Sequence, residues 1–537
     1  MTRTPRHWLL VLFLVASLSL AAPRSVDAQA RSAQKASVQR PSAPSSSGAE
    51  ARTAKAFEEA RKQGPEALHA FLYRMPKGAD LHNHLSGAVY AESWIRAAGE
   101  DHLCVDTKTL AFAKPTDVRN NIPICKAGEV PASSVPQDQH LYDELIDAFS
   151  MRTFVPVTSD SGHDHFFATF DKFGGTDKKH MGEWLDEVAT RAAAQNEQYL
   201  ELMDTPDFKS AAALAASIGY NPSFVEYRGK LLSSGLKESI PAISAALDRA
   251  EEDRKQREHC GQPDAQPACD VKIRYIYQIL RGLPPETVFA QVVLGSEAAT
   301  ADPRFVGMNF VQPEDGYISM RDYRLQMQML DAVHGFYPQV HISLHAGELA
   351  PGMVPPEGLT FHIRLAVEQG EAERIGHGVD VMYEDRPYEL LKEMAAKHVM
   401  VEVNLTSNDV ILNVKGDDHP FEIYRKYGVP VALSTDDEGV SRIDLTHEYV
   451  RAAVTYPLSY HDLKKMARTS LEHSFLPGAS LWQQSTPETL DRPVTACASQ
   501  VGQDTPAGEC ADLVSGSEKA QQQWELERRF HAFESNF

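Results

Sequence analysis

Residues 340–348 read VHISLHAGE, an apolar run that leads directly into a histidine, a glycine and a glutamate. The run Val340–His345 is short and aliphatic and is followed closely by Gly347, so it predicts a buried strand that ends in a turn. A pattern typical of an amphipathic helix follows at Leu359–Glu368, and another apolar run begins at Arg374. Strand, helix and strand in this spacing indicate a βαβ unit with parallel strands.

The same alternation extends in both directions along the chain. Helical patterns lie between short apolar runs at Met181–Asn196, Met320–His334 and Arg386–Ala396. Strands alternating with helices predict an α/β fold, and eight of them close naturally as a (β/α)8 barrel. The eight runs that we interpret as strands are Ala79–His84, Gln198–Met203, Ile273–Ile279, Phe305–Val311, Val340–His345, Arg374–His377, Val399–Asn404 and Val429–Ser434.

Several segments fall outside this repeat, and we place the barrel itself at residues 75–486. Residues 54–74 have the spacing of two short helices broken at Gly64-Pro65, which predicts an N-terminal helical extension. Leu103–His140 and Asp253–Asp270 are hydrophilic stretches that read as two insertions. Residues 487–537 end in a charged helical pattern and are expected to form a C-terminal appendage.

The six cysteines fall into three pairs that are close in sequence. Each pair brackets a polar loop that contains proline or glycine, most clearly in CGQPDAQPAC, which begins at Cys260. No C-x-x-C occurs, so thiolate zinc sites and thioredoxin-like redox chemistry lack support. Free structural thiols are the alternative to disulfides. The predicted disulfides are Cys104–Cys125, Cys260–Cys269 and Cys497–Cys510.

The first 28 residues have the organisation of a secretory signal peptide. Arg3 and Arg6 precede an apolar run from Trp8 to Ala22, and a small-residue cleavage site ends at Ala28. The run is shorter than the roughly 20 residues that a spanning helix needs, which disfavours a membrane anchor. Residues 29–53 lack apolar periodicity and predict a flexible leader. We therefore expect a secreted or periplasmic protein with no membrane attachment after signal cleavage.

The composition narrows the class of ligand. The 537 residues are 42% hydrophobic and 24% charged, with a formal net charge of −21. This is globular composition, and its acidity disfavours nucleic acids and anionic membranes as partners. No phosphate-binding glycine loop and no basic cluster for a nucleotide phosphate is evident. Small neutral or cationic ligands remain open.

Four polar motifs stand at the ends of predicted strands, where a barrel displays its active-site groups. Taken alone, the four motifs have ordinary interpretations, which in chain order are a chance histidine pair, a satisfied core histidine, a turn histidine and a helix N-cap. The motifs are His82-Asn83-His84 at the first strand, His345-Ala346-Gly347-Glu348 at the fifth, Arg374-Ile375-Gly376-His377-Gly378 at the sixth, and Ser434-Thr435-Asp436-Asp437 at the eighth.

Their joint occurrence points to a metal centre. Three histidines and one aspartate can converge on a single ion, and this donor set without thiolate suits zinc, so we expect one Zn²⁺ per chain. The metal would lower the pKa of a bound water from roughly 15.7 to about 7, and Glu348 and His377 are the titratable groups beside it. The residues alone predict a metal-dependent hydrolase without naming a substrate. The predicted ligands are His82, His84, His345 and Asp436.

Between Met75 and Arg442, the segments MPKGADLHNHLSGA, SLHAGE, RIGHGVD and ALSTDD, in this order, resemble the adenosine deaminase family of metal-dependent amidohydrolases. The signal peptide, the N-terminal helices and the first insertion are similar to its secreted, growth-factor-type branch. The resemblance implies a TIM barrel, the zinc ligands above, and hydrolysis of adenosine or 2′-deoxyadenosine to inosine and ammonia.

The resemblance also implies roles for individual residues. Glu348 matches the general acid/base that serves purine N1, and His377 matches the residue that holds the attacking hydroxide. Asp437 matches the carboxylate that bonds purine N7. Gln312 stands where the family has a glycine that bonds N3, and Ser86 stands where several members carry an acid. We place His84, Ser86, Gln312 and Asp437 at the substrate.

The two departures, Gln312 and Ser86, leave the substrate open between adenosine, another 6-substituted purine and a cyclic amide. A non-catalytic signalling protein on the same barrel is a further alternative, which the complete set of metal and acid/base residues disfavours. The oligomeric state is left open. One aromatic group we interpret as core packing rather than as a lid over a base: Phe154, Phe166, Phe167, Phe170 and Phe173, with His163 and His165 nearby.

Overall fold

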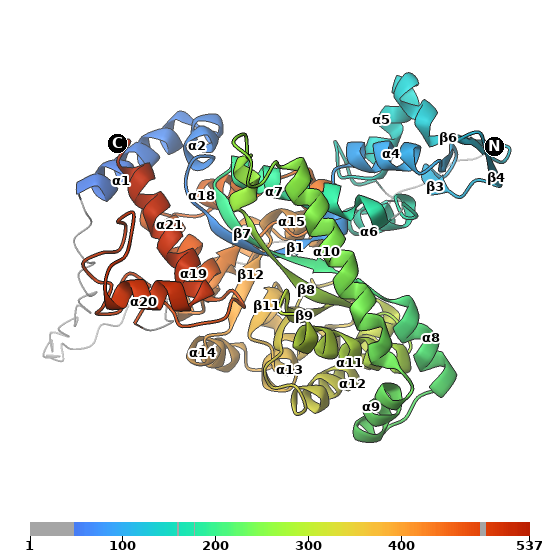
Figure 1. Cartoon of the computed structure of the whole chain (residues 1–537). Helices are drawn as coiled ribbons and strands as arrows, with labels where there is room; N and C mark the ends of the chain where they lie inside the picture. The colour runs from blue at the N-terminus through green and yellow to red at the C-terminus, as the bar shows by residue number, and fades with distance from the viewer. Residues whose placement is uncertain (1–47, 158–159, 177, 484–489) are drawn as a thin grey trace, which may run out of the picture. The chain divides into compact units, whose positions relative to one another are not determined.

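The computed structural model describes residues 48–157, 160–176, 178–483 and 490–537. Within the compact unit Ser47–Phe537, eight strands form one sheet in the order β1-β7-β8-β9-β10-β11-β12-β13, all pairs parallel (Figure 1). Each lies at or close to its predicted position. The strands are β1 Gly78–His84, β7 Glu197–Asp204, β8 Lys272–Leu280, β9 Phe305–Val311, β10 His341–Ala346, β11 Arg374–His377, β12 Met400–Val403 and β13 Val431–Leu433.

The sheet closes on itself at three of the predicted metal ligands. Asn83 and Asp436 form a parallel bridge. The backbone N–H of Asp436 donates to the carbonyl of His82 at 2.9 Å, and the N–H of His84 donates to the carbonyl of Asp436 at 3.1 Å. These bonds join the C-terminal end of β1 to the segment after β13. The predicted (β/α)8 barrel is therefore confirmed.

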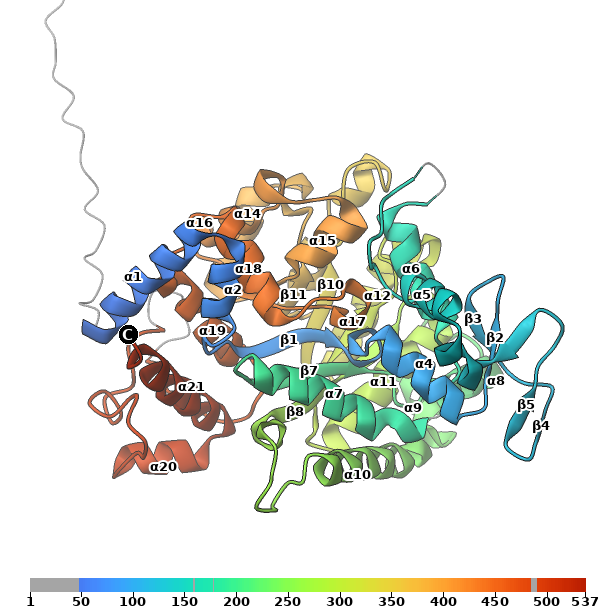
Figure 2. The ribbon, with the colours of Figure 1, turned by 90° about the horizontal axis from the view of Figure 1, so that it is seen from above.

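Helices cover the outside of the sheet (Figure 2). Helix α11 is largely buried; it starts with a proline in its first turn, where no helical N–H is lost, and packs against β8, β9 and its neighbours α8 and α12. The surrounding helices are α7 Met181–Ala194, α8 Lys209–Ile218, α9 Phe224–Ser233, α10 Ile240–Arg257, α11 Pro285–Ala301, α12 Tyr317–His334, α13 His362–Glu368, α14 Pro387–Lys397, α15 Leu405–Leu412, α16 Phe421–Tyr427, α18 Leu445–Thr455 and α19 Tyr460–Glu472, with the short α3 Leu85–Ala88 and α17 Glu438–Ser441 at strand ends.

The N-terminal helices pack against the C-terminal ones. These elements are α1 Gly48–Gln63, α2 Pro65–Leu72, α20 Glu509–Gly516 and α21 Glu518–Glu534. The ring of Phe71 lies 5.4 Å from that of Phe533. Helix α1 begins at Gly48, so residues 48–53 are not part of a flexible leader as predicted. Thr53 is buried and Arg52 donates to the carbonyl of Phe537 at 2.8 Å, so the C-terminal segment supplies a surface that the local sequence does not reveal.

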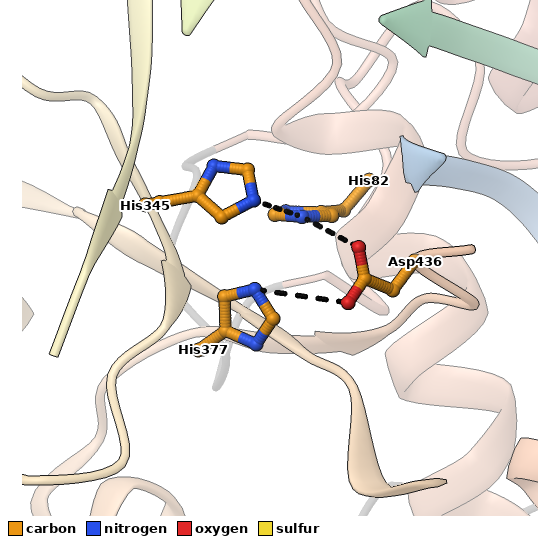
Figure 3. Close-up of side chains that lie close together, drawn as sticks. All are labelled: His82, His345, His377 and Asp436. Atoms are coloured by element: carbon orange, nitrogen blue, oxygen red, sulfur yellow. Dashed lines mark hydrogen bonds and ion pairs between the residues drawn. The ribbon is translucent and has the colours of Figure 1, made fainter. Parts of the chain in front are cut away.

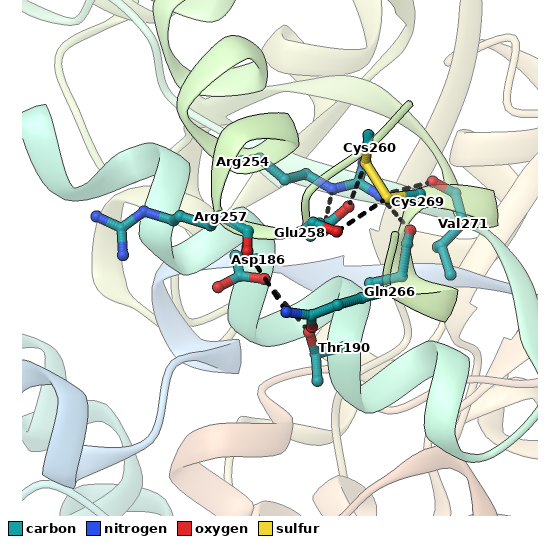
Figure 4. The surroundings of a disulfide bond; sticks show 10 residues. Asp186, Thr190, Arg254, Arg257, Glu258, Cys260, Gln266, Cys269 and Val271 are labelled. Carbon is teal, nitrogen blue, oxygen red and sulfur yellow. Dashed lines mark hydrogen bonds and ion pairs between the residues drawn. A yellow bond between two sulfur atoms is a disulfide. The ribbon is translucent and has the colours of Figure 1, made fainter. Parts of the chain in front are cut away.

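All three predicted disulfides are present. The first insertion, between α4 Ala91–Glu100 and α5 Gln139–Ala148, forms a three-stranded sheet and a hairpin. Around Cys260–Cys269, Arg254 of α10 pairs with Glu258 at 2.6 Å and donates to the carbonyl of Ala268 at 2.6 Å (Figure 4). The loop is thereby folded back onto its helix. The insertion strands are β2 Cys104–Asp106, β3 Ala111–Ala113, β4 Asp117–Arg119, β5 Ile122–Ile124 and β6 Glu129–Pro131.

The predicted signal peptide, residues 29–47 of the leader and the boundary at Thr486 lie outside the described residues. In the part of the chain that is described, no helix has both the length and the apolar character needed to cross a membrane.

Candidate active site

The strand ends bring four donor atoms from β1, β10 and the segment after β13 to one point. Figure 3 draws three of the four residues, His82, His345 and Asp436, together with His377 of β11. Nε2 of His345 lies 3.1 Å from Nε2 of His82 and 3.3 Å from Nε2 of His84. Oδ1 of Asp436 lies 3.4 Å from Nε2 of His82 and 3.3 Å from Nε2 of His84. All four side chains are buried. The structure thus brings together the four residues predicted as ligands.

The spacing of these atoms fits a zinc ion. Zinc–nitrogen bonds of about 2.0–2.1 Å in tetrahedral geometry place neighbouring donor atoms roughly 3.3–3.4 Å apart. The four measured separations, 3.1 to 3.4 Å, match this edge length. Three imidazoles and one carboxylate are also the donor types that zinc takes in hydrolytic sites.

Each of the three histidines is held from behind by an oxygen atom. A hydrogen on Nδ1 directed at that oxygen leaves the Nε2 lone pair for a metal, which is the arrangement that second-shell partners enforce. The three contacts are His82 Nδ1 to Glu402 Oε2 at 2.6 Å, His84 Nδ1 to Gln278 Oε1 at 2.8 Å, and His345 Nδ1 to Asn309 Oδ1 at 2.9 Å.

Glu348 lies beside this cluster on a turn that requires glycine. Gly347 has φ of 73°, and an added Cβ would meet Asp380 Oδ1 at 2.5 Å. Both oxygens of Glu314 accept from the turn, at 3.1 Å from the Gly347 N–H and 2.7 Å from the Glu348 N–H. Burial, together with the negative charges of Asp436 and Glu314, raises the pKa of Glu348 well above its usual value. The carboxyl is therefore held in place in an environment that favours its protonated form.

Asp437 lies at the same mouth, and its environment also favours a protonated carboxyl. Burial raises its pKa to about 8, with the charge of Asp436 adding to the effect. Its Oδ1 has no hydrogen-bond partner among the described residues. A Cβ at Gly87 would overlap that oxygen, so the glycine makes room for it. An unpartnered buried oxygen of this kind is available to a ligand.

A cavity of about 390 Å³ opens over the cluster. It is lined by seven of the nine predicted site residues, and Ser86 and Gln312 form its exposed part. His82 and His377 lie behind this surface: His377 Nε2 is 3.7 Å from Glu348 Oε1 and 3.9 Å from Asp436 Oδ2. The lining residues are His84, Ser86, Phe166, Phe167, Phe170, Asp171, Gln278, Leu280, Val311, Gln312, Pro313, His345, Glu348, Asp436 and Asp437.

The phenylalanines of the segment after the first insertion are not only core residues. Phe166, Phe167 and Phe170 lie on α6, Gly162–Lys172, and line the cavity, which corrects the sequence interpretation. Phe166 and Phe173 are also buried in the cluster under this helix. Both descriptions hold because α6 lies across the barrel mouth, with one side toward the cavity and another toward the insertion.

Sequence reasoning missed the residues that hold the site from behind. Gln278, Asn309 and Glu402 are polar residues inside apolar strand runs, and that misfit could have marked them, because a parallel strand is buried on both faces. Ser407, which donates to Asp436 Oδ2 at 2.6 Å, stands on a helix and carries no such signal.

Comparison with known proteins agrees with this geometry. The model of a family described as adenosine deaminase matches residues 187–481, more than half of the chain. An adenosine deaminase of Clostridium perfringens is 28% identical over 288 residues, which cover 50% of this chain and 78% of that enzyme. One of Salmonella heidelberg is 39% identical over 137 residues, covering 25% of this chain and 38% of that enzyme.

A solved structure, that of Arabidopsis ADAL complexed with IMP, aligns with a TM-score of 0.50 and 18% identity, covering 75% of this chain and 93% of that chain. At this identity the likeness supports the barrel alone. The family match begins after β1, and the fold itself brings His82 and His84 to the matched region. The chain belongs to the adenosine deaminase family.

Proposed function

We propose that this protein is a zinc-dependent hydrolytic deaminase that converts adenosine or 2′-deoxyadenosine to inosine and ammonia. The observation that carries the proposal is the placement of Glu348, on the cavity wall, and His377, directly behind that wall, beside one four-donor cluster in a chain of this family. A protein that only binds a ligand has no need of a buried carboxyl next to such a site.

The residues divide the chemistry between them. A bound zinc ion would supply an activated water at neutral pH. Glu348, protonated at rest, gives its proton to N1 of the purine and regains one from that water, as a positioned acid and base. His377 Nε2 faces the same space and stabilises the oxygen that attacks C6. The proton of the hydroxyl added at C6 then passes to the amino group, which leaves as ammonia as the C6 carbonyl forms, so water and adenosine balance inosine and ammonia.

Asp437 orients the purine. Since its pKa is raised to about 8, the carboxyl is mainly protonated at neutral pH and can donate to a ring nitrogen such as N7, which only accepts. The aromatic rings on α6 complete an apolar wall for a flat base.

The cavity favours a nucleoside over a nucleotide. None of its lining residues is lysine or arginine, whereas Asp171, Glu348, Asp436 and Asp437 are acidic. A phosphate dianion would find no lysine or arginine to pair with there and would be repelled by the carboxylates of Asp171 and Asp436.

One observation favours a second candidate, a purine substituted differently from adenosine. Gln312 keeps a backbone φ of 86°, and its Oε1 accepts from the Gly282 N–H at 2.8 Å. The side chain is thus fixed on the cavity wall with its amide Nε2 free to donate. This adds a donor and bulk where a glycine would leave open space.

We also propose that the protein is exported and acts outside the cytoplasm. Support comes from the N-terminal sequence, which has the organisation of a signal peptide, and from the three disulfides, which persist in oxidising compartments.

The test is the ultraviolet spectrum of purine substrates incubated with the purified protein, with and without a metal chelator. The panel is adenosine, 2′-deoxyadenosine, adenine, N6-methyladenosine and AMP. We expect a chelator-sensitive shift to the inosine spectrum with the nucleosides and little turnover of AMP. Turnover confined to N6-methyladenosine or adenine would favour the second candidate. Inactivity of the zinc-loaded protein on the whole panel would overturn the proposed function.

A further inference from the structure

The role of His377 depends on which ring nitrogen carries its proton. Its Nε2 faces the cavity side of the site and has no hydrogen-bond partner among the described residues, while its Nδ1 faces away, toward α15. A protonated Nε2 can only donate to a reacting oxygen, and an unprotonated Nε2 can only accept. The two tautomers would therefore do opposite chemistry at the same place.

The hydrogen-bond chain behind His377 begins at a backbone N–H, a group that can only donate. The backbone N–H of Phe421, at the start of α16, donates to Nδ1 of His419 at 3.2 Å. An amide N–H cannot accept, so Nδ1 of His419 is the acceptor. His419 is 3% exposed, and burial, with the charge of Arg451 adding to it, lowers its pKa to about 3. The ring is neutral, so its single hydrogen is on Nε2.

That hydrogen sets the orientation of an amide. Nε2 of His419 lies 3.0 Å from Oδ1 of Asn408, so the oxygen of Asn408 faces His419. The amide nitrogen then faces His377, at 2.9 Å from Nδ1. Asn404 approaches the same nitrogen at 3.4 Å, but its own oxygen has no partner among the described residues, so its direction is not fixed. Asn408 is fully buried.

We propose that this relay, from the Phe421 backbone through His419 and Asn408, locks His377 as the Nε2–H tautomer and makes it a hydrogen-bond donor to the reacting oxygen. Asn408 and His419 are positioning residues that touch no reacting atom. It follows that His377 cannot take a proton from water at Nε2, so proton transfer falls to Glu348. The assignment of proton transfer to Glu348 rests on the proposed function, whereas the tautomer of His377 does not.

The direct test is nuclear magnetic resonance of the full-length, zinc-loaded protein with ¹⁵N-labelled histidine. Two-bond ¹H–¹⁵N spectra distinguish the two tautomers of each neutral ring, and His377→Gln and His419→Gln variants assign the signals. We expect both His377 and His419 as Nε2–H. A wild-type spectrum with His377 as Nδ1–H would overturn the proposal whether or not the protein turns over any purine.

Asn408→Asp is the decisive variant. Its carboxylate accepts on both sides, so it favours a hydrogen on Nδ1 of His377 and reverses the tautomer. A wrong tautomer in the Ser-His-Asp triad costs about 10⁴ in kcat, and we expect a fall in kcat of about 10²–10⁴ with KM changed less than about 3-fold. A reversed spectrum with unchanged kcat would contradict the donor role. An unreversed spectrum would contradict the relay.

A second pair of variants covers the case in which Asn408→Asp does not fold. His419→Gln retains a side-chain N–H that can donate to Asn408, while His419→Phe retains the ring volume without a donor. We expect His419→Phe to free the Asn408 amide to rotate, so that both tautomers of His377 are populated and kcat falls by about 10-fold or more. In His419→Gln most of the wild-type kcat should be kept. Equal kcat and equal spectra for the two variants would refute the relay.

Discussion

Both ends of the barrel bury charged side chains, but they treat them differently. At the N-terminal end, Lys77 is fully buried directly before β1, and its Nζ donates to the carbonyls of Leu72 at 2.7 Å and Met75 at 3.0 Å. At the C-terminal end, Asp437 Oδ1 and His377 Nε2 are buried with no hydrogen-bond partner among the described residues. Lys77 is thus satisfied by the backbone around it, whereas these two atoms at the cavity end are left without a partner in the described part of the chain.

Arg374, at the start of β11, connects the two ends. Its side chain is fully buried and pairs with Glu201 of β7 and Glu402 of β12, both at 2.7 Å. Glu402 in turn holds His82. The difference between the ends teaches that stability and reactivity occupy separate layers of one barrel. An unpartnered buried polar group costs free energy, so it persists where the binding of a ligand compensates for that cost.

The largest expected effect is at the open end. Glu348→Gln removes the group that accepts and donates protons but keeps the shape of the side chain. We expect kcat/KM to fall by about 10³-fold, within the range for a positioned acid and base. Zinc content, measured by atomic emission, is expected to be unchanged. A variant that keeps more than about a tenth of wild-type activity would show that another group transfers the proton.

The next effect concerns the connection between the ends. Glu402→Gln weakens the acceptor behind His82, and we expect zinc affinity to fall by about 10–100-fold. Glu201→Gln is the matched control, because it changes the same arginine's other partner and does not touch His82. It is expected to lower the melting temperature while leaving zinc affinity nearly unchanged. Competition with a chelator measures the zinc affinity of the two variants. Equal losses of affinity would mean that the two layers are not separate.

The smallest effect is at the closed end, where Lys77→Met keeps length but loses the donors. We expect a loss of about 1–3 kcal/mol in the free energy of unfolding, because backbone carbonyls stay buried without a partner. Activity per folded, zinc-loaded molecule should be retained.

The same lysine predicts a pH dependence. Burial lowers its pKa from 10.5 to about 7, so between these values the unfolded chain binds more protons than the folded one. Stability therefore rises with pH from about 7 to about 10.5 through this group. Denaturant unfolding across that range is expected to show a smaller rise in Lys77→Met than in wild type, and identical slopes would mean that Lys77 does not titrate there.

The barrel and the histidine–aspartate cluster could be predicted from the sequence because both depend on short-range patterns. Parallel strands buried on both faces read as apolar runs, and polar residues at their ends stand out, as at His345 and Asp436. The residues that hold these histidines from behind could not be predicted from the sequence. Glu402 lies 320 residues from His82 along the chain, and no local pattern couples the two. The start of α1 and the cavity-facing side of α6 were missed for the same reason, since distant segments cover them.

The sequence by itself determined the alternation of strands and helices, the three disulfide pairs and the donor atoms available to a metal. Only the tertiary structure decided how those donors are used. Glu402, Gln278 and Asn309 place an oxygen behind each of the three histidines predicted as ligands, whereas Asn408 places an amide nitrogen behind His377. The physical reason is that the position of a proton on an imidazole ring depends on which atom lies within about 3 Å of it, and only folding sets that distance.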